Sequence, residues 1–244
     1  MGPFITFEGP EGSGKTTQIR LLEQRLKADS VSVLCTREPG GSPIGEQIRH
    51  VLHDLGNQAM DPRTEALLYS AARAQHVAQV ILPALRADQV VISDRYAEST
   101  LAYQGYGHGL DLDTLQQITA FATDGVQADL VIYMDLDVAL GLQRKRQDLQ
   151  AGRGEWNRMD DQAVAFHQRV RQGYLDMAAA EPARWLVIDA AESVENIHDR
   201  VYQHIRALLQ ASGESHRARR RASQPSTTQG EQEHGDQVTC QYCP

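Results

Sequence analysis

Residues 4–17 read FITFEGPEGSGKTT, and this stretch decides the fold of the chain. An apolar run, Phe4–Phe7, predicts a buried strand, and apolar residues at helical spacing follow from Thr16. Between the two, Gly9–Thr16 matches the pattern G-x-x-x-x-G-K-[ST], in the strand–turn–helix context that this phosphate-binding loop requires. The stretch therefore predicts a nucleotide-phosphate site at the start of a helix.

The residue types of this loop suit phosphate chemistry. Glycines let successive backbone N–H groups face an anion, and the helix that follows adds the positive end of its dipole. Lys15, one of only three lysines in the chain, is expected to reach the β- and γ-phosphates. Mg²⁺ is expected at the Thr16 hydroxyl and at Asp94, a carboxylate at the end of another predicted strand. The residues expected to bind the nucleotide are Gly9, Pro10, Glu11, Gly12, Ser13, Gly14, Lys15 and Thr16.

Four more short, β-branched runs predict strands at Val31–Thr36, Val90–Ile92, Leu130–Met134 and Trp185–Ile188. Helical patterns alternate with them at residues 16–27, 44–54, 63–82, 112–123, 138–150, 162–180 and 194–210, and Pro83 is expected to stop the third. Apolar strands alternating with helices are typical of parallel sheets that are covered on both faces. The predicted fold class is therefore α/β, of the P-loop NTPase type: a three-layer α/β/α arrangement with a five-stranded parallel sheet.

Composition narrows the classes of function. The chain has 244 residues and a net charge of −8, which argues against general nucleic-acid binding, because such binding rests on phosphate neutralisation. We expect no secretory leader and no membrane span, because charged and polar residues interrupt every apolar run well before the length of a bilayer. Three cysteines are too few for a disulfide framework and fit a reducing cytoplasm, which is the expected location.

A phosphate-binding loop by itself does not distinguish kinases from GTPases or motor ATPases. A regulatory GTPase would carry the base-recognition motif Asn-Lys-x-Asp, but Lys27 lies in Leu-Lys-Ala-Asp and Lys145 in Arg-Lys-Arg-Gln. Arg37 and Arg95 each follow a predicted strand, the position at which α/β sheets bind ligands. A kinase with an anionic acceptor is therefore favoured over a GTPase.

Five motifs occur together along the chain: FEGPEGSGKTT, TREPGG, YSAARAQ, DRYAESTLAYQG and RGEWNRMD. In their order and spacing the chain resembles the thymidylate kinase family, from Phe4 to about Asp160. The resemblance implies transfer of the γ-phosphoryl group of ATP to dTMP, giving dTDP and ADP on the way to dTTP, with Mg²⁺ as cofactor. It also implies a homodimer.

The resemblance assigns residues to the acceptor phosphate and sugar. Arg37 and Arg95 would hold the dTMP phosphate, and two guanidinium groups suit a bidentate grip on a dianion. Tyr103 would pack under the deoxyribose where a 2′-hydroxyl would otherwise lie. Glu11 would accept a hydrogen bond from the 3′-hydroxyl.

For the base, the resemblance implies that Tyr69 stacks on thymine and that Arg73 donates to a thymine carbonyl. The i,i+4 spacing places both on one helix face. Thr100 and Gln104 would line the base pocket. Taken without the resemblance, the two tyrosines at 69 and 103 would more simply be half-buried aromatics, and Arg73 a solvated helix residue. The family commonly has Phe where this chain has Tyr69.

Residues 143–160 are rich in arginine and are expected to form a lid. The alternative to a lid is a charged segment that is exposed to solvent and has no role in binding. A phosphoryl-transfer site needs cations over the transferring group, and the phosphate-binding loop of this chain carries no arginine. We therefore expect Arg153 and Arg158 to join Lys15 and Arg95 in catalysis, with Arg153 as the closer phosphate contact. Asn157 replaces a more common acidic residue of the family.

The chain is expected to divide into a kinase domain and a tail. Residues 1–211 would be the kinase domain, with the acceptor-binding region at about 37–110, and residues 212–244 a disordered tail low in apolar residues. The tail carries an arginine cluster and the pair Cys240 and Cys243, which leaves binding of an anionic partner or of a metal open. Two alternative functions stay open: a P-loop kinase for another acceptor, and a nucleotide-dependent binding module without phosphoryl transfer.

Overall fold

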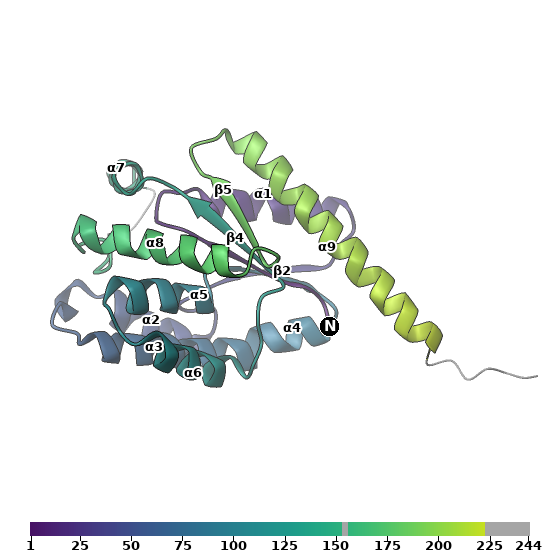
Figure 1. The fold of residues 1–244 in the computed structure, drawn as a ribbon, viewed down its shortest axis with the longest axis horizontal. Helices are drawn as coiled ribbons and strands as arrows, with labels where there is room; N and C mark the ends of the chain where they lie inside the picture. The colour runs from purple at the N-terminus through teal and green to yellow at the C-terminus, as the bar shows by residue number, and fades with distance from the viewer. Residues whose placement is uncertain (153–155, 223–244) are drawn as a thin grey trace, which may run out of the picture.

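A five-stranded sheet forms the centre of the molecule. The computed structural model describes residues 1–152 and 156–222, with side chains described to residue 211. All strand pairs are parallel and the order is β2-β3-β1-β4-β5 (Figure 1). The strands are β1 (Phe4–Glu8), β2 (Val33–Arg37), β3 (Val90–Asp94), β4 (Leu130–Asp135) and β5 (Trp185–Asp189). The predicted fold class is confirmed.

Helices connect the strands and cover both faces of the sheet. The main helices are α1 (Lys15–Ala28), α2 (Pro43–His53), α3 (Pro62–His76), α4 (Leu82–Arg86), α5 (Ala97–Thr100), α6 (Leu112–Thr123), α7 (Val138–Gln150), α8 (Val164–Ala180) and α9 (Val194–Ala222). Shorter helical segments are the 3₁₀ turn η1 (Leu55–Asn57) and the π-helical segments η2 (Val77–Ile81) and η3 (Leu101–Gly107). Within the described ranges, no helix has the combined length and apolar character that crossing a membrane requires.

Two apolar clusters, one on each face of the sheet, hold the helices against the sheet and so join the three layers. On one face, Leu22 of α1 and Val201 of α9 pack with sheet residues such as Ile132. On the other face, Phe166 of α8 and Ile81 of η2 pack with a separate set of sheet residues. Figure 1 shows α1 and α9 together on one side, with α3, α6 and α8 on the other. Alternate strand residues therefore face opposite layers, as a doubly covered sheet requires.

The carboxyl ends of three strands lie level at one edge of the sheet. Phe7 of β1 and Arg37 of β2 both pair with Asp94, the last residue of β3. Because parallel strands end at the same edge, the phosphate-binding loop and the turns that begin at Arg37 and Arg95 are neighbours in space. This edge is where a ligand is expected.

The structure corrects two boundaries. The third helix was expected to stop at Pro83, but the chain stays helical to Arg86. The π turn of η2 precedes the proline and changes the hydrogen-bond partners, so Pro83 lies in the first turn of α4, where a missing N–H is tolerated.

The second correction concerns the last helix. It was expected to end at Gln210, but α9 continues to Ala222, so residues 212–222 are helical where disorder was expected. Ala and Arg are good helix formers, and the next proline is Pro225. The rest of the expected tail, including Cys240 and Cys243, lies outside the described residues.

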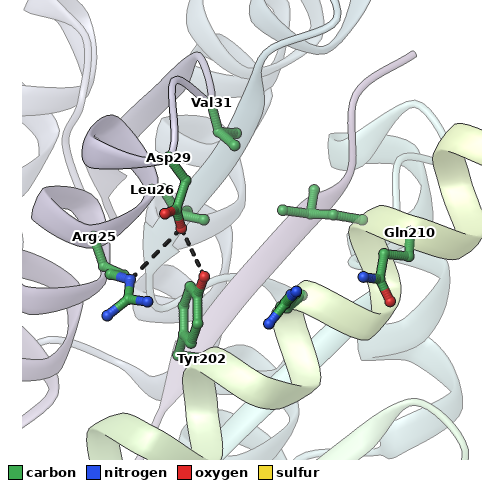
Figure 2. A pocket seen from close by; sticks show the side chains of 8 residues that line it. Arg25, Leu26, Asp29, Val31, Tyr202 and Gln210 are labelled. Carbon is green, nitrogen blue, oxygen red and sulfur yellow. Dashed lines mark hydrogen bonds and ion pairs between the residues drawn. The ribbon is translucent and has the colours of Figure 1, made fainter.

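A cavity of about 490 Å³ lies between α1 and α9 (Figure 2). Tyr202 of α9 donates its hydroxyl to Asp29 Oδ2 at 2.7 Å, and the Arg25 guanidinium lies 4.5 Å from the centre of the Tyr202 ring. These contacts fix α9 against the carboxyl end of α1. The phosphate-binding loop is at the opposite end of α1, so this cavity is separate from the candidate site.

Candidate active site

The phosphate-binding loop connects β1 to α1 through left-handed backbone. Gly14, the residue before α1, has a φ of 89°, and a Cβ there would meet no atom within 4 Å. The backbone angle, and not a lack of space, therefore favours glycine at this position. Ser13 Oγ donates to the Pro10 carbonyl at 2.8 Å and closes the loop on itself.

Lys15 is buried in this loop. Its Nζ donates to the carbonyl oxygens of Gly9 at 3.1 Å and Pro10 at 3.0 Å. Burial, and then the positive charge of Arg95, lowers the pKa of Lys15. The ammonium group is thus placed inside the loop by backbone acceptors, at the position where phosphates of a nucleotide would lie.

The two residues expected to hold Mg²⁺ are together. Thr16 Oγ1 lies 3.4 Å from Asp94 Oδ2, at the junction of α1 and β3. A hydroxyl and a carboxylate are hard oxygen ligands, and Mg²⁺ is typically held by one or two protein oxygens together with phosphate and water oxygens. The residues present therefore fit a magnesium ion, which Thr16 and Asp94 would hold.

Glu11 lies at the centre of a cluster of cations. Arg95 donates to Glu11 Oε1 at 2.8 Å, and Lys145 Nζ is 3.6 Å from Glu11 Oε2. Burial tends to raise the pKa of Glu11, but Lys15, Arg95 and Lys145 together hold it well below its ordinary value. Glu11 therefore stays ionised among three cations, of which Lys145 is also paired with Asp160.

Arg95 has an uncommon backbone conformation. Its φ is 74°, in the left-handed region that non-glycine residues rarely adopt. The backbone is held there because Arg95 N donates to the Phe7 carbonyl at 2.9 Å and Ser93 Oγ donates to the Arg95 carbonyl at 2.7 Å. The guanidinium lies 5.1 Å from the centre of the Tyr103 ring. Arg95 and Tyr103, which are both expected to contact dTMP, are therefore neighbours.

Glu8, which the sequence analysis did not single out, binds the turn that follows Arg95. The buried carboxylate accepts from Tyr96 N at 2.8 Å, Ser99 Oγ at 2.7 Å and the Tyr174 hydroxyl at 2.7 Å. Burial, with repulsion from Glu98, raises the pKa of Glu8 to about 7. Its position directly before the glycine-rich loop is the signal that could have found it.

Arg73, which is expected to line the base pocket, is fully buried. It donates from Nε to Glu38 Oε2, from Nη1 to Thr100 Oγ1 and from Nη2 to the Tyr96 carbonyl, each at 2.8 Å. The structure thus brings Arg73 and Thr100 together. Tyr69 is half-buried, and burial together with Glu65 raises the pKa of its hydroxyl above the ordinary value.

Glu65 is a second residue that the sequence analysis missed. It is buried and accepts from Gln104 Nε2 at 2.7 Å, and His108 Nε2 lies 3.2 Å from the same oxygen. Arg158 forms an ion pair with its other oxygen. Glu65 stands four residues before Tyr69, so helical spacing could have placed it on the same face.

Of the two arginines expected in the lid, the structure describes Arg158. Arg158 is buried, pairs with Glu65 and donates to the Leu52 carbonyl at 3.3 Å. A buried carboxylate such as Glu65 needs a cationic partner, and Arg158 supplies it. Arg153 lies outside the described residues.

Two other arrangements at this edge were not anticipated. Arg37 is exposed, and its Nη2 donates to both carboxylate oxygens of Glu46 of α2, at 2.9 and 3.0 Å, so an incoming phosphate would compete with that carboxylate. Lys145 of α7 is buried and pairs with Asp160 Oδ2 at 2.7 Å. Lys145 therefore joins the lid segment to Glu11 of the phosphate-binding loop.

The fold and site together define the class of P-loop kinases. The glycine-rich loop follows the first strand of a 2-3-1-4-5 parallel sheet, and Arg95 at the adjoining edge pairs with Glu11 of that loop. The sequence model described as thymidylate kinase matches residues 7–201. The chain belongs to the thymidylate kinase family, whose members use ATP to phosphorylate dTMP to dTDP.

Individual relatives are similar over most of their length. The thymidylate kinase of Roseiflexus sp. strain RS-1 is 49% identical over 208 residues, which cover 82% of this chain and 92% of the relative. That of Latilactobacillus sakei subsp. sakei is 46% identical and covers 87% of this chain and 97% of the relative. The crystal structure of thymidylate kinase from Ehrlichia chaffeensis superposes with a TM-score of 0.65 at 34% identity, over 84% of this chain and 98% of that chain. The expected family and enzyme class are confirmed.

Proposed function

We propose that residues 1–211 form a kinase domain that transfers the γ-phosphoryl group of ATP to dTMP with Mg²⁺ as cofactor. The observation that carries the proposal is the cluster of Lys15, Arg95 and Lys145 around Glu11, at the junction of the phosphate-binding loop and the acceptor segment. A phosphate oxygen of dTMP attacks the γ-phosphorus, the bond to the β–γ bridging oxygen breaks, and ADP leaves. Such a step needs positioning and positive charge more than a covalent intermediate.

On the donor side, the amides of the phosphate-binding loop and Lys15 hold the β- and γ-phosphates. Thr16 and Asp94 would hold Mg²⁺, which when bound neutralises charge on the phosphate oxygens. Arg153 and Arg158 stay our candidates for the cations of the lid. Arg158 would exchange Glu65 for phosphate oxygens in that role.

On the acceptor side, Arg37 and Arg95 grip the phosphate of dTMP, and Arg37 leaves Glu46 to do so. Tyr103 packs under the deoxyribose, and Glu11 accepts from the 3′-hydroxyl. The base lies in a pocket lined by four residues, which are Tyr69, Arg73, Thr100 and Gln104. Support comes from the contacts of Arg73 with Thr100 and of Arg95 with Tyr103.

An acceptor panel tests the proposed reaction. We expect ADP release from ATP, followed in a coupled assay, to be fastest with dTMP and at least about tenfold slower in kcat/KM with dUMP, which lacks one methyl group. CMP and AMP should give no rate above background. A preference for another monophosphate would indicate a kinase for a different acceptor. ATP binding without stimulation by any monophosphate would indicate a nucleotide-dependent binding module.

We also propose that the chain forms a homodimer through α3 and α6. Phe121 of α6 is 89% exposed and Leu67 of α3 is 56% exposed, while the two helices pack side by side (Figure 1). Large apolar side chains exposed on adjacent helices are typical of an interface. A cytoplasmic location stays a prediction from the low cysteine count.

The Phe121→Asp substitution should weaken this dimer at least about tenfold, because a charge would replace a large apolar contact. Light scattering coupled to size-exclusion chromatography, over a dilution series, measures the dissociation constant. Val194→Asp is the matched control, since Val194 is also exposed but lies at the start of α9, on the other face of the sheet. Equal dimer affinity in the two variants would rule out this interface.

A further inference from the structure

A chain of buried polar side chains connects the end of β2 to the candidate base pocket. Thr36 Oγ1 lies 2.7 Å from His76 Nε2, and His76 Nδ1 lies 3.0 Å from Glu38 Oε1. The other oxygen of Glu38 accepts from Arg73 Nε at 2.8 Å, and Arg73 in turn donates to Thr100. The contacts therefore run without a gap from β2 to the pocket.

The three central members of this chain are almost inaccessible to solvent. The exposed fractions are 0% for His76, 6% for Glu38 and 1% for Arg73. Both ring nitrogens of His76 and both carboxylate oxygens of Glu38 have a partner, so each side chain is fixed in orientation. A carboxylate paired with a guanidinium only accepts hydrogen bonds, so Nδ1 of His76 is the donor toward Glu38.

The loop after β2 closes directly over the imidazole. Gly41 has a φ of 72°, and a Cβ there would come within 2.5 Å of His76 Nε2 and 2.9 Å of Thr36 Oγ1. The backbone at Gly41 thus leaves the ring no room on this side. His76 is held by packing as well as by its hydrogen bonds.

We propose that His76 is a positioning residue for recognition of the acceptor base. Its Nδ1 donates to the Glu38 carboxylate, and this carboxylate in turn fixes the orientation of the Arg73 guanidinium toward the candidate base pocket. Glu38, Thr100 and the Tyr96 carbonyl take three of the five N–H groups of Arg73, which leaves one on each terminal nitrogen for a ligand. The inference rests on the proposed role of Arg73 in reading the base of dTMP.

Two substitutions of His76 separate positioning from general stability. The amide nitrogen of Asn occupies the place of Nδ1, and that of Gln the place of Nε2. His76→Asn keeps the donor toward Glu38, whereas His76→Gln keeps only a group near Thr36. We expect His76→Gln to raise the KM for dTMP about tenfold, with KM for ATP and kcat within about threefold, because one hydrogen bond to a charged group is lost. His76→Asn should stay within about threefold of the wild type in every constant.

Calorimetric titration with dTMP alone, without ATP, should show the same tenfold difference in the dissociation constant. Glu38→Gln provides a second variant if His76→Gln does not fold, and it should weaken dTMP binding in the same direction. Equal effects of the Asn and Gln substitutions, or an equal rise of KM for both substrates, would overturn the positioning role and leave His76 a structural residue. Unchanged dTMP binding in both His76→Gln and Glu38→Gln would overturn it as well.

Arg73→Lys separates failure of this inference from failure of the proposed site. If Arg73→Lys weakens dTMP binding strongly while His76→Gln does not, only the positioning role is wrong. If Arg73→Lys leaves dTMP binding unchanged, Arg73 does not read the base, and the assignment of the base pocket is wrong too. The acceptor panel then still decides whether the chain is a dTMP kinase.

Discussion

The Lys15→Met variant should lose about a thousandfold in kcat for phosphoryl transfer to dTMP. Lys15 is buried inside the phosphate-binding loop, where its Nζ has only the carbonyl oxygens of Gly9 and Pro10 as hydrogen-bond partners in the described structure. Those partners are uncharged, so the ammonium charge is available for the β- and γ-phosphates of ATP. Charge that develops on these phosphates in the transition state would face a methyl thioether in the variant.

The chain offers a matched control for this substitution. Lys27 is exposed near the end of α1 and pairs with Glu23 at 2.6 Å, far along the helix from the phosphate-binding loop. Lys27→Met removes the same charge from the same helix and should leave kcat within about twofold, because an exposed pair contributes little. Steady-state kinetics at saturating ATP and dTMP, with circular dichroism to confirm folding, measure both. A loss below tenfold in Lys15→Met would contradict the donor site.

The cations around Glu11 explain why a carboxylate is tolerated inside the predicted phosphate-binding loop. Lys15, Arg95 and Lys145 surround this one carboxylate. Glu11 orients Arg95 through a 2.8 Å hydrogen bond before any acceptor binds, and a dianionic phosphate can then take the remaining donors. In the proposed function, this carboxylate would preorganise Arg95 for the acceptor phosphate.

Most of the fold could be predicted because the signals are local. The run Val90–Ile92 is apolar on both faces, which is typical of a strand buried in a parallel sheet, and β3 begins at Val90. The predicted helix end at Pro83 was wrong. Proline usually ends a helix, but the π turn of η2 before it lets this helix continue. Hydrogen-bond shifts of this kind depend on tertiary packing and leave little trace in the sequence.

The site could be predicted only where a motif carried it. Lys15 and Arg95 follow from residue type and spacing, and the structure places both at the expected edge. Glu65 and Glu8 carry only weak signals, the helical spacing to Tyr69 and the position before the glycine-rich loop, because an acidic residue in a helix or at a strand end is usually solvated. Their function depends on burial against partners that are distant in sequence: Glu8 bonds to Tyr174, which is 166 residues away.

The difference in stability between the Glu8→Gln variant and the wild type should change with pH. Glu8 has a native pKa of about 7 against an ordinary value of 4.5, so the folded state holds this proton more tightly than the unfolded chain does. Between these values the native state binds more protons, and its contribution to the free energy of unfolding falls as pH rises. Gln carries no charge at any pH and lacks this contribution.

The free energy of unfolding of Glu8→Gln minus that of the wild type should therefore rise by roughly 2 to 3 kcal/mol between pH 5 and pH 8. Urea unfolding, followed by circular dichroism at constant ionic strength, measures the difference at each pH. Imperfect hydrogen bonds between Gln and its three donors would shift the difference by a constant and leave its slope unchanged. Burial and Arg49 lower the pKa of His53 to about 4, which acts in the opposite direction in both proteins and cancels in the difference.

Glu195→Gln is the matched control, because Glu195 is exposed in the first turn of α9. An exposed substitution changes stability little, so its difference from the wild type should stay within about 0.5 kcal/mol over the same range. If the Glu8→Gln difference is equally flat, the three hydrogen bonds and Arg95 stabilise the Glu8 carboxylate enough to offset its burial. In that case Glu8 would support the Arg95 turn as a permanent anion, and acceptor binding would be independent of its protonation.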